Sequence, residues 1–314
     1  MRKLWLLSTI AFACLVTFTI INYNHNQAKV PETNPNNSLD KPARIVSLAP
    51  NLTEILFALG LGKRIVAVSS DSDYPPDAAN KSKVGTFWQP NTEAIIAAKP
   101  DLVVCESFDQ QMAVAKTLRR TGLNVLVLRV ESIRELFSAI EKIGQAAGCT
   151  TAAQQLAADI KNQLDHIRAI SSSTGKVKVL WVVQTEPLRV AGRNTFVNEI
   201  VELAGGQNTI GPTIDQYPSV GTEEIIGCGT EVVIQPAMGA ENIHKQQIAA
   251  EEFWSRFANL PAVKNKRIYV IDADTTLRLG PRLPQGLQTV AQCLHPELFT
   301  QPKEPNQEME RTDG

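Results

Sequence analysis

The chain has 314 residues, of which 43% are hydrophobic and 20% charged, and its formal net charge is −1. These fractions are typical of a globular protein and exclude a wholly disordered or collagen-like chain. Because 31 basic residues are balanced by 32 acidic ones, no overall positive field favours nucleic-acid binding. Four histidines and no Cys-x-x-Cys pair leave little basis for a metal site.

Residues 1–21 predict an export segment. Arg2 and Lys3 precede 18 uncharged residues, and a helix over these would span roughly 27 Å, close to the apolar thickness of a bilayer. The basic residues predict that the rest of the chain is exported to the periplasm or to the outer face of the cytoplasmic membrane. A membrane anchor and a signal peptide cleaved near Ala28 remain open alternatives, and lipidation at Cys14 is a third.

Two polar stretches are predicted to be disordered. Residues 22–42 contain six asparagines and three prolines and predict a flexible linker, and residues 300–314 predict a tail. Residues 43–299 are therefore expected to form the fold.

The core alternates strands with helices in chain order. Runs rich in Val, Ile and Leu predict strands at 44–48, 64–69, 101–105, 124–128, 176–183, 231–235 and 267–272. Helical patterns lie near 51–60, 91–99, 109–121, 132–143, 194–204, 246–257 and 284–293. Asn51 with Glu54, and Ser132 with Glu135, predict helix-capping boxes, and Gly60 predicts a helix stop. This alternation predicts an α/β fold.

An internal repeat indicates two related lobes. The sequence NTEAIIAAKPDLVV (91–104) aligns without gaps on GTEEIIGCGTEVVI (221–234), with five identities in fourteen and with Asp101 opposite Glu231. Chance likeness of two short helix–strand units is the weaker interpretation. We expect an N-terminal lobe over 43–149 and a C-terminal lobe over 172–299.

Residues 150–171 have a helical pattern and no strand candidate. An apolar stripe is formed by Leu156, Ile160, Leu164 and Ile167. The stripe predicts a helix lying across both lobes, and a coiled coil is the weaker interpretation because the pattern is short. A single helical connector predicts only modest lobe movement.

Apart from Cys14 in the export segment, the chain has four cysteines: Cys105, Cys149, Cys228 and Cys293. An even number of cysteines in an exported protein is compatible with disulfide bonds. Pairing within each half is one of three connectivities, and free buried thiols are an equal alternative. His166, His244 and His295 have no partner at ligand spacing, and a solvated or capping role is favoured for each.

Recognisable enzymatic motifs are absent. The sequence has no Gly-x-Ser-x-Gly, Gly-Lys-Ser/Thr, His-Glu-x-x-His or dinucleotide-binding pattern. The space between the lobes is therefore the expected ligand site.

The segment RIVSLAPNLTEILFALGLGKRIVAVSSDSDYPP (44–76), followed by 91–104, resembles the helical-backbone solute-binding proteins of ABC importers, and most closely the cobalamin-binding members. The resemblance spans about residues 43–295. It implies two Rossmann-like lobes with parallel sheets, bridged by one long helix, with cobalamin (vitamin B12) or a related corrinoid bound between them. It implies delivery to an ABC permease dimer, with no catalysis and no cofactor.

The resemblance also assigns roles to individual residues. Glu93 and Glu223 match the acids that dock on the permease, and the alternative for each is a first-turn acid that complements the helix dipole. Residues matching ligand-contacting positions of the cleft are Phe87 or the adjacent Trp88, Tyr217, and the pair Asp274 and Arg278. Asp71 stands where the cobalamin-binding relative has an aromatic residue, and Ala204 stands where that relative has a disulfide cysteine.

Two alternatives to corrinoid binding remain. A ferric siderophore or haem is a ligand of the same fold. Arg278, Arg189 and Arg193 are candidate contacts for an anionic siderophore, and Tyr217 is a candidate haem ligand. An anchored α/β enzyme is the alternative of another class.

Overall fold

The computed structural model describes residues 41–237 and 242–299, and the chain from Lys41 onward forms one compact unit. The expected export segment, most of the linker and the tail lie outside the described residues. Among the described helices, none combines the length and hydropathy needed to cross a bilayer.

The first half contains a five-stranded parallel sheet in the order β3-β2-β1-β4-β5. The strands are β1 (Ile45–Ser47), β2 (Ile65–Val68), β3 (Ser82–Lys83), β4 (Leu102–Glu106) and β5 (Val125–Leu128). In the centre, Ile45 of β1 lies opposite Ile65 on one side and Leu102 on the other. Strands in this position are buried on both faces, which explains their continuous Val and Ile content.

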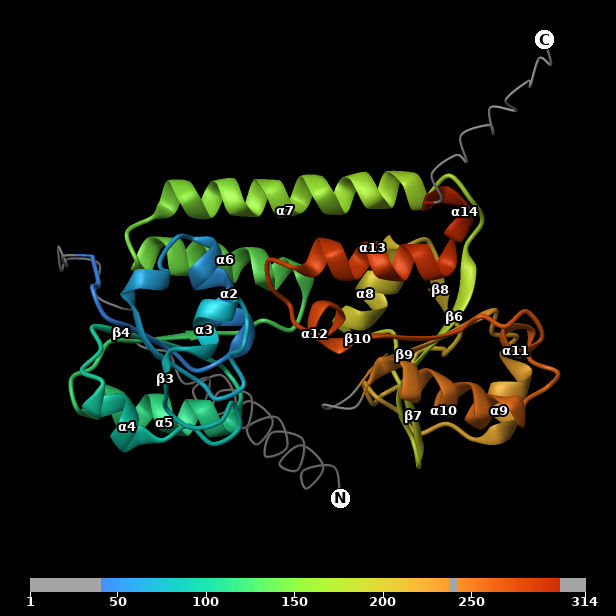
Figure 1. Ribbon diagram of the computed structural model, residues 1–314, viewed down its shortest axis with the longest axis horizontal. Coiled ribbons are helices and arrows are strands. Elements are labelled where there is room, and N and C mark those ends of the chain that lie inside the picture. Colours follow the sequence, from blue (N-terminus) through green and yellow to red (C-terminus); the bar gives the residue numbers. More distant parts are fainter. Residues whose placement is uncertain (1–40, 238–241, 300–314) are drawn as a thin grey trace, which may run out of the picture. The chain divides into compact units, whose positions relative to one another are not determined.

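Five α-helices and a short 3₁₀ turn, η1 (Gly62–Arg64), accompany this sheet (Figure 1). The helices are α2 (Pro50–Ala58), α3 (Pro76–Ala79), α4 (Thr92–Ala97), α5 (Asp109–Arg120) and α6 (Ile133–Ala146). Gly60, at φ 75°, follows the end of α2 as expected of a glycine stop.

The two predicted capping boxes have different outcomes. At α6, the Ser132 hydroxyl accepts a hydrogen bond from the amide of Glu135 at 3.2 Å, which confirms Ser132 as the N-cap, but the Glu135 carboxylate accepts the amide of Glu131 instead of that of Ser132. The predicted box of Asn51 and Glu54 is wrong, because Pro50 occupies the first turn of α2 and Ala49 is its N-cap. The fixed φ of proline favours that position. Asn51 and Glu54 therefore lie within the helix, where their side chains are available for other partners.

The second half contains a sheet centred on β6 (Val177–Thr185), with β9 (Val232–Ala237) and then β10 (Ile268–Asp272) on one side. These strands, and β8 (Gly206–Asn208), pair in parallel, whereas β7 (Leu188–Val190) pairs antiparallel with the end of β6. The sequence patterns did not predict β3, β7 or β8, because two or three residues are too few to show periodicity.

Seven helices of the described residues belong to this half: α8 (Phe196–Leu203), α9 (Thr222–Gly227), α10 (Ile243–Ser255), α11 (Pro261–Lys264), α12 (Ala273–Thr276), α13 (Leu283–Leu294) and α14 (Pro296–Phe299). Helices α8 and α13 cover one face of the sheet, and α10 covers the other (Figure 1). The α/β class is thereby confirmed.

The internal repeat has a structural counterpart. Helices α4 and α9 begin and end 130 residues apart, and each leads into a central strand. The Asp101 carboxylate accepts the amides of Ala43 and Arg44 just before β1, and the Glu231 carboxylate accepts the amide of Lys178 in β6. Equivalent acids thus hold the starts of equivalent strands, which supports duplication.

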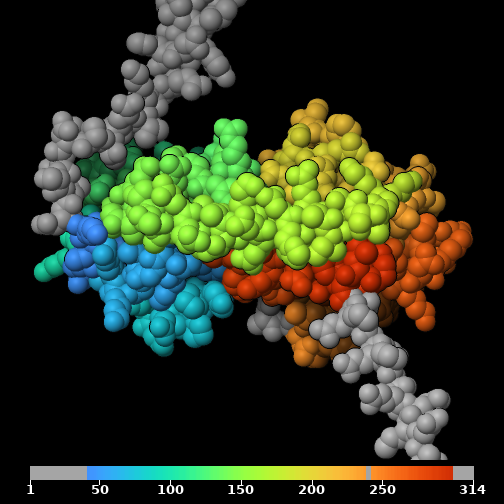
Figure 2. All heavy atoms as spheres, turned by 90° about the horizontal axis from the view of Figure 1, so that it is seen from above, coloured from blue at the N-terminus to red at the C-terminus, as the bar shows by residue number. Residues whose placement is uncertain are grey.

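Helix α7 (Thr150–Ser171) matches the predicted connector and packs on α6, α13 and α8 (Figures 1 and 2). Its buried positions include Ile160, Leu164 and Ile167 of the predicted stripe. One apolar cluster runs from Leu52 through this stripe to Trp181 in the second sheet. The two halves therefore share a continuous core beneath α7.

All four cysteines in the described residues are free thiols, so none of the disulfide pairings is formed. His295 was predicted to have a solvated or capping role. It is not solvated, because its ring is buried and its Nδ1 lies 3.0 Å from the Thr174 hydroxyl, but it is the C-cap residue of α13. Packing of α13 and α14 against the core places it there. His166 and His244 are exposed, as a solvated role requires, and His244 lies in the first turn of α10.

Candidate functional site: a cavity between the two lobes

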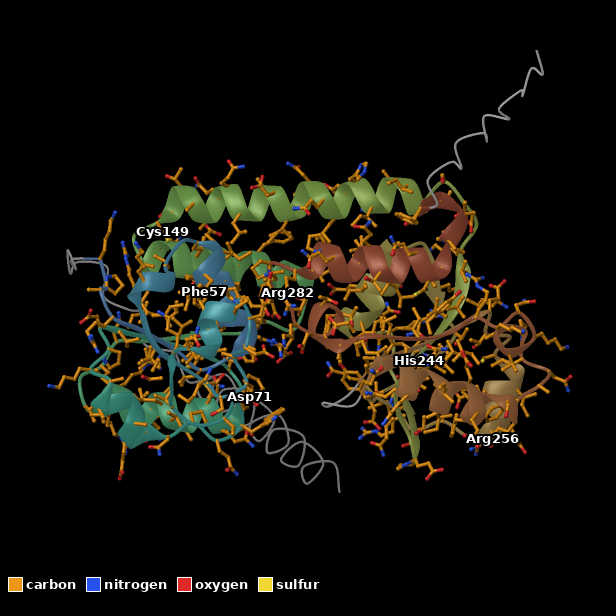
Figure 3. The ribbon with its side chains drawn as sticks, in the orientation of Figure 1. Phe57, Asp71, Cys149, His244, Arg256 and Arg282 are labelled. Carbon is orange, nitrogen blue, oxygen red and sulfur yellow. The ribbon has the colours of Figure 1, made fainter. Side chains whose placement is uncertain are left out.

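A cavity of about 320 Å³ lies where the carboxyl ends of the first sheet's strands face the second half. Its lining from the first half includes Asn51, Asp71, Phe87, Trp88, Glu106 and Val130, and from the second half Phe196, Leu277, Arg278 and Leu279. Figure 3 shows Asp71 at the edge of the first sheet toward the second. Ligands of open α/β sheets bind at such edges.

Three aromatic rings form one wall of this region. The Phe87 ring lies 4.9 Å from that of Trp88 and 4.8 Å from that of Phe108, and Trp88 and Phe108 are 5.2 Å apart. Trp88 is 62% exposed. Phe87 and Trp88, the two candidates for the aromatic position, both line the cavity. Exposed rings held by ring–ring contacts offer a rigid apolar surface.

Buried Gln111 on α5 holds the aromatic loop against the sheet. Its amide donates to the carbonyls of Leu48 and Phe87 at 2.9 Å each, and its oxygen accepts the amide of Glu106 at 2.7 Å. The Asp71 carboxylate accepts the amide of Phe87 at 2.6 Å. Asp71 thus supports the loop as well as lining the cavity.

Glu106 places a carboxyl group on the cavity wall at the end of β4. The Asn51 side-chain amide donates to Glu106 Oε1 at 2.7 Å. Burial raises the pKa of Glu106 to about 7, and the nearby charge of Glu131 adds to this, whereas the Asn51 hydrogen bond opposes it. Near neutral pH, Glu106 therefore exists in both neutral and ionised forms.

Arg278 is shared by carboxylates from both halves. It contacts Asp73 at 2.7 Å, Asp274 at 2.7 Å and Glu54 at 3.5 Å. Partial burial raises the pKa of Asp73, but the hydrogen bond and charge of Arg278 outweigh it and leave that pKa below its usual value. Burial raises the pKa of Asp274 despite the same arginine. The charge of Arg278 is thus neutralised within the protein.

A second arginine joins the halves beside the cavity. Arg282 donates to both oxygens of Glu54, at 2.9 and 2.6 Å, and its guanidinium lies 4.0 Å from the centre of the Tyr74 ring. The Glu54 side chain is only 2% exposed. Figure 3 shows Arg282 between α2 and α13. This pair links α2 of the first half to the start of α13 in the second.

The structure brings together only some of the expected ligand residues. Asp71, Phe87, Trp88 and Arg278 line the cavity, and Asp274 is paired with Arg278 as expected without lining it. Tyr217 is not among the lining residues. Its ring packs on the shared core, and burial together with the charge of Glu131 raises its pKa.

Both other arginines proposed for an anionic ligand bind main-chain carbonyls. Arg189 donates to the carbonyl of Tyr217, and Arg193 donates to those of Ile210 and Asn208.

Sequence reasoning missed Asn51, Glu54, Asp73, Glu106, Phe108 and Arg282. A usable signal existed for Glu106, which is the charged last residue of an otherwise apolar parallel strand. Glu54 and Arg282 are 228 residues apart, and no local pattern connects them. In the described part of the chain, no group of three or more His, Cys, Asp or Glu residues could hold a metal ion.

Glu93 and Glu223 occupy equivalent first-turn positions on α4 and α9, and both are exposed. The N-caps are other residues, Asn91 for α4 and Gly221 for α9, and both acids lie in the first turn, where a negative charge complements the helix dipole. One turn later, Ile96 and Ile226 are 40% and 60% exposed. Each acid is thus followed by an exposed apolar side chain.

Residues 45–275 match the family model of the periplasmic binding proteins. The chain belongs to this family. This binding protein is 30% identical to an uncharacterized ABC transporter substrate-binding lipoprotein, YvrC, of Bacillus subtilis, over 82% of each chain. It is 29% identical to the vitamin B12-binding protein of Vibrio parahaemolyticus, over 80% of this chain and 88% of the relative.

A solved structure from Staphylococcus epidermidis, described as a possible iron-binding periplasmic solute-binding protein, resembles this binding protein with a TM-score of 0.72 and 30% identity. The likeness covers 81% of this chain and 99% of that one. The family and these relatives are substrate-binding transport proteins rather than enzymes. This binding protein is accordingly the extracytoplasmic substrate-binding component of an ABC transporter. This role implies a permease partner.

Proposed function

We propose that the protein binds cobalamin or a related corrinoid in the cavity between its lobes and delivers it to the permease. The observation that carries this proposal is the chemistry of the cavity. An aromatic wall stands beside the polar groups of Asn51, Asp71 and Glu106, and the cavity's arginine is already paired. Such a site suits a large, mostly neutral ring system that carries amide groups.

The charges near the cavity disfavour the anionic alternatives. Asp71 contributes negative charge, as does the ionised form of Glu106, and Arg278 is neutralised by Asp73 and Asp274. An anionic siderophore or the propionates of haem would have to displace these carboxylates or bind against them. The position of Tyr217 off the cavity wall also weakens its candidacy as a haem ligand.

The size of the cavity limits how the ligand is held. A volume of about 320 Å³ lies at the lower end of the range for ligand pockets. A corrinoid would therefore be enclosed only in part, with one edge against the aromatic wall. The lobes would close on it by small movements, because they share a core beneath α7.

Titration of the purified protein with cyanocobalamin, haemin and a ferric siderophore tests this function. We expect submicromolar binding of cyanocobalamin, and a corrinoid absorption spectrum when the protein is purified from its host. The proposal fails if cyanocobalamin does not bind at micromolar concentration while haemin or the siderophore does.

Within this proposal, Glu93 and Glu223 dock on the permease dimer. Their support is the equivalence of α4 and α9, with the same acid and the same exposed isoleucine on each helix. Two related surfaces suit a partner with two-fold symmetry. The exposed side chains of Ile96 and Ile226 place an apolar surface next to each acid, on which the permease can pack.

Reversal of both charges tests the docking role. Glu93→Lys with Glu223→Lys should abolish transport and leave ligand affinity unchanged. The matched control is Glu141→Lys with Glu202→Lys, which reverses one exposed acid in each half on α6 and α8, across the sheets from α4 and α9. Equal transport by the two double variants, or loss of ligand affinity in the first, would reject docking.

The same proposal places the protein in the periplasm or at the outer face of the cytoplasmic membrane, exported by residues 1–21. Cleavage, retention and lipidation at Cys14 predict different masses for the mature protein, so mass spectrometry distinguishes them. The lobe boundaries remain part of this proposal, with 43–149 and 172–299 joined by 150–171.

A further inference from the structure

The Glu106 side chain places a carboxyl group in the cavity, where it can discriminate between ligands. It ends β4, an interior strand of the first sheet, at the carboxyl edge that faces the cavity. The buried Gln111 side chain accepts its amide, so the main chain at this point is fixed. A carboxyl group held on a strand end is positioned more rigidly than one on a free loop.

The two oxygens of this carboxyl group differ. Oε1 accepts the hydrogen bond from Asn51, whereas Oε2 has no hydrogen-bonding partner among the described residues. Asn51 is itself oriented, because its own oxygen accepts the amide of Leu52 at 2.8 Å. The group is therefore fixed on one side and available to a ligand on the other.

Charged groups surround Glu106 from several elements. Asp71 comes from the loop after β2, Glu131 from the loop after β5, and Arg278 from the second half of the chain. Burial, and after it the charge of Glu131, favour the neutral form of Glu106, whereas Arg278 is already paired with Asp73 and Asp274. A neutral carboxylic acid has one donor, at Oε2, and one acceptor with remaining capacity, at Oε1.

We propose that Glu106, oriented by Asn51, selects a ligand that presents a carboxamide to the cavity and rejects one that presents a carboxylate. A carboxamide complements the neutral acid in both directions, since its oxygen accepts from Oε2–H and its N–H donates to Oε1. When Glu106 is ionised, the carboxamide N–H still donates to it. A carboxylate offers only acceptors, and it meets like charge once Glu106 has lost its proton.

This inference rests on the proposed function, because corrinoids carry carboxamide side chains whereas haem carries propionates. It adds a pH dependence that aromatic contacts alone would not produce. Amide-bearing ligands should bind nearly independently of pH between 6 and 8. Carboxylate-bearing ligands should lose up to about tenfold in affinity per pH unit above pH 7, since their binding needs a proton on Glu106.

The test compares two corrinoids, dicyanocobinamide with amide side chains and dicyanocobyrinic acid with carboxylates, by titration at pH 6, 7 and 8. The wild-type protein should prefer the amide, by a ratio that grows with pH. Glu106→Gln, which supplies a donor at every pH, should reduce that ratio and remove its pH dependence. The control Asp71→Asn removes a charge from the same cavity and should retain the pH dependence.

A second measurement needs no ligand. The tryptophan fluorescence of the protein, to which Trp88 beside Glu106 contributes, should change with a midpoint near pH 7 in the wild-type protein and not in Glu106→Gln. Titration of haemin alongside tests a dicarboxylate of a different ring system, which should bind more tightly to Glu106→Gln than to wild type at pH 8.

The outcomes separate the two proposals. If dicyanocobinamide binds but Glu106→Gln leaves both the ratio and its pH dependence unchanged, the role of Glu106 is rejected and the corrinoid function stands. If haemin binds in preference to both corrinoids, the corrinoid function and the amide selection are both rejected. Failure to bind any of the three probes rejects both as well.

Discussion

Loss of the Arg282 guanidinium should destabilise the protein far more than loss of an exposed cation. Arg282 makes two hydrogen bonds to Glu54, whose side chain is almost completely buried. The informative changes are Arg282→Met, Glu54→Gln and the two combined. Methionine keeps the length and much of the volume of the arginine stem, so the main loss is the charge and its hydrogen bonds.

The magnitude follows from the distances. At an effective dielectric constant of about 20, a contact at 2.6 Å corresponds to a gross attraction of about 6 kcal/mol, and the Arg278 contact at 3.5 Å to about 5 kcal/mol. Removing one partner of a buried ion pair costs about 3–5 kcal/mol. Because Arg278 still contacts Glu54, we expect about 3 kcal/mol for Arg282→Met.

Urea unfolding of the purified protein, followed by circular dichroism, gives the free energy of unfolding of each variant. The double variant should recover about half of the loss, because it leaves no uncompensated charge. The matched control is Lys161→Met on α7, whose partner Asp165 is exposed, and it should change the free energy by less than about 0.5 kcal/mol. A loss below 1 kcal/mol for Arg282→Met, or strictly additive single variants, would refute the reasoning.

Three further predictions concern the cavity and the thiols. Trp88→Ala should weaken cyanocobalamin binding by about tenfold, as measured by calorimetric titration. The control Met112→Ala changes an exposed apolar residue on α5 and should leave the affinity unchanged. Equal effects of the two substitutions would contradict a role of the aromatic wall in binding. Because burial raises the pKa of Glu106 from 4.5 to about 7, the folded protein binds more protons than the unfolded chain between these values. The free energy of unfolding should therefore fall by roughly 3 kcal/mol as the pH rises from 4.5 to 7 relative to Glu106→Gln, and parallel profiles in urea unfolding would contradict this. Burial raises the pKa of Cys105 to about 12 and of Cys293 to about 11, so both thiols should react with Ellman's reagent only after unfolding, and rapid reaction of the native protein would contradict their burial.

Much of the fold follows from local patterns in the sequence. The stripe of Ile160, Leu164 and Ile167 predicts α7 because burial on one face imposes helical spacing. The ungapped repeat predicts the equivalence of α4 and α9, and Asp101 and Glu231 make the same contact with the first strand of each sheet. These features depend on neighbours within a few residues, or on comparison of two segments, and both are visible in one sequence.

The polar part of the site depends on long-range pairing and was predicted less well. Glu54 fits a helix-capping pattern with Asn51, but the helix begins earlier and both side chains bind partners from distant segments. Tyr217 follows a loop pattern typical of ligand contact, yet its ring packs on the core. A side chain's direction is set by tertiary packing, which a local pattern does not contain.

The continuous core beneath α7 has a practical consequence for dissecting this protein. If the chain were cut between the two sheets, the inner face of α7 and the residues around Leu52 or Trp181 would face water. Such fragments would expose a large apolar patch and would aggregate. Neither half can serve as a separately expressed module, so grafting the ligand specificity onto another scaffold would require transfer of both sheets together with the helix that joins them.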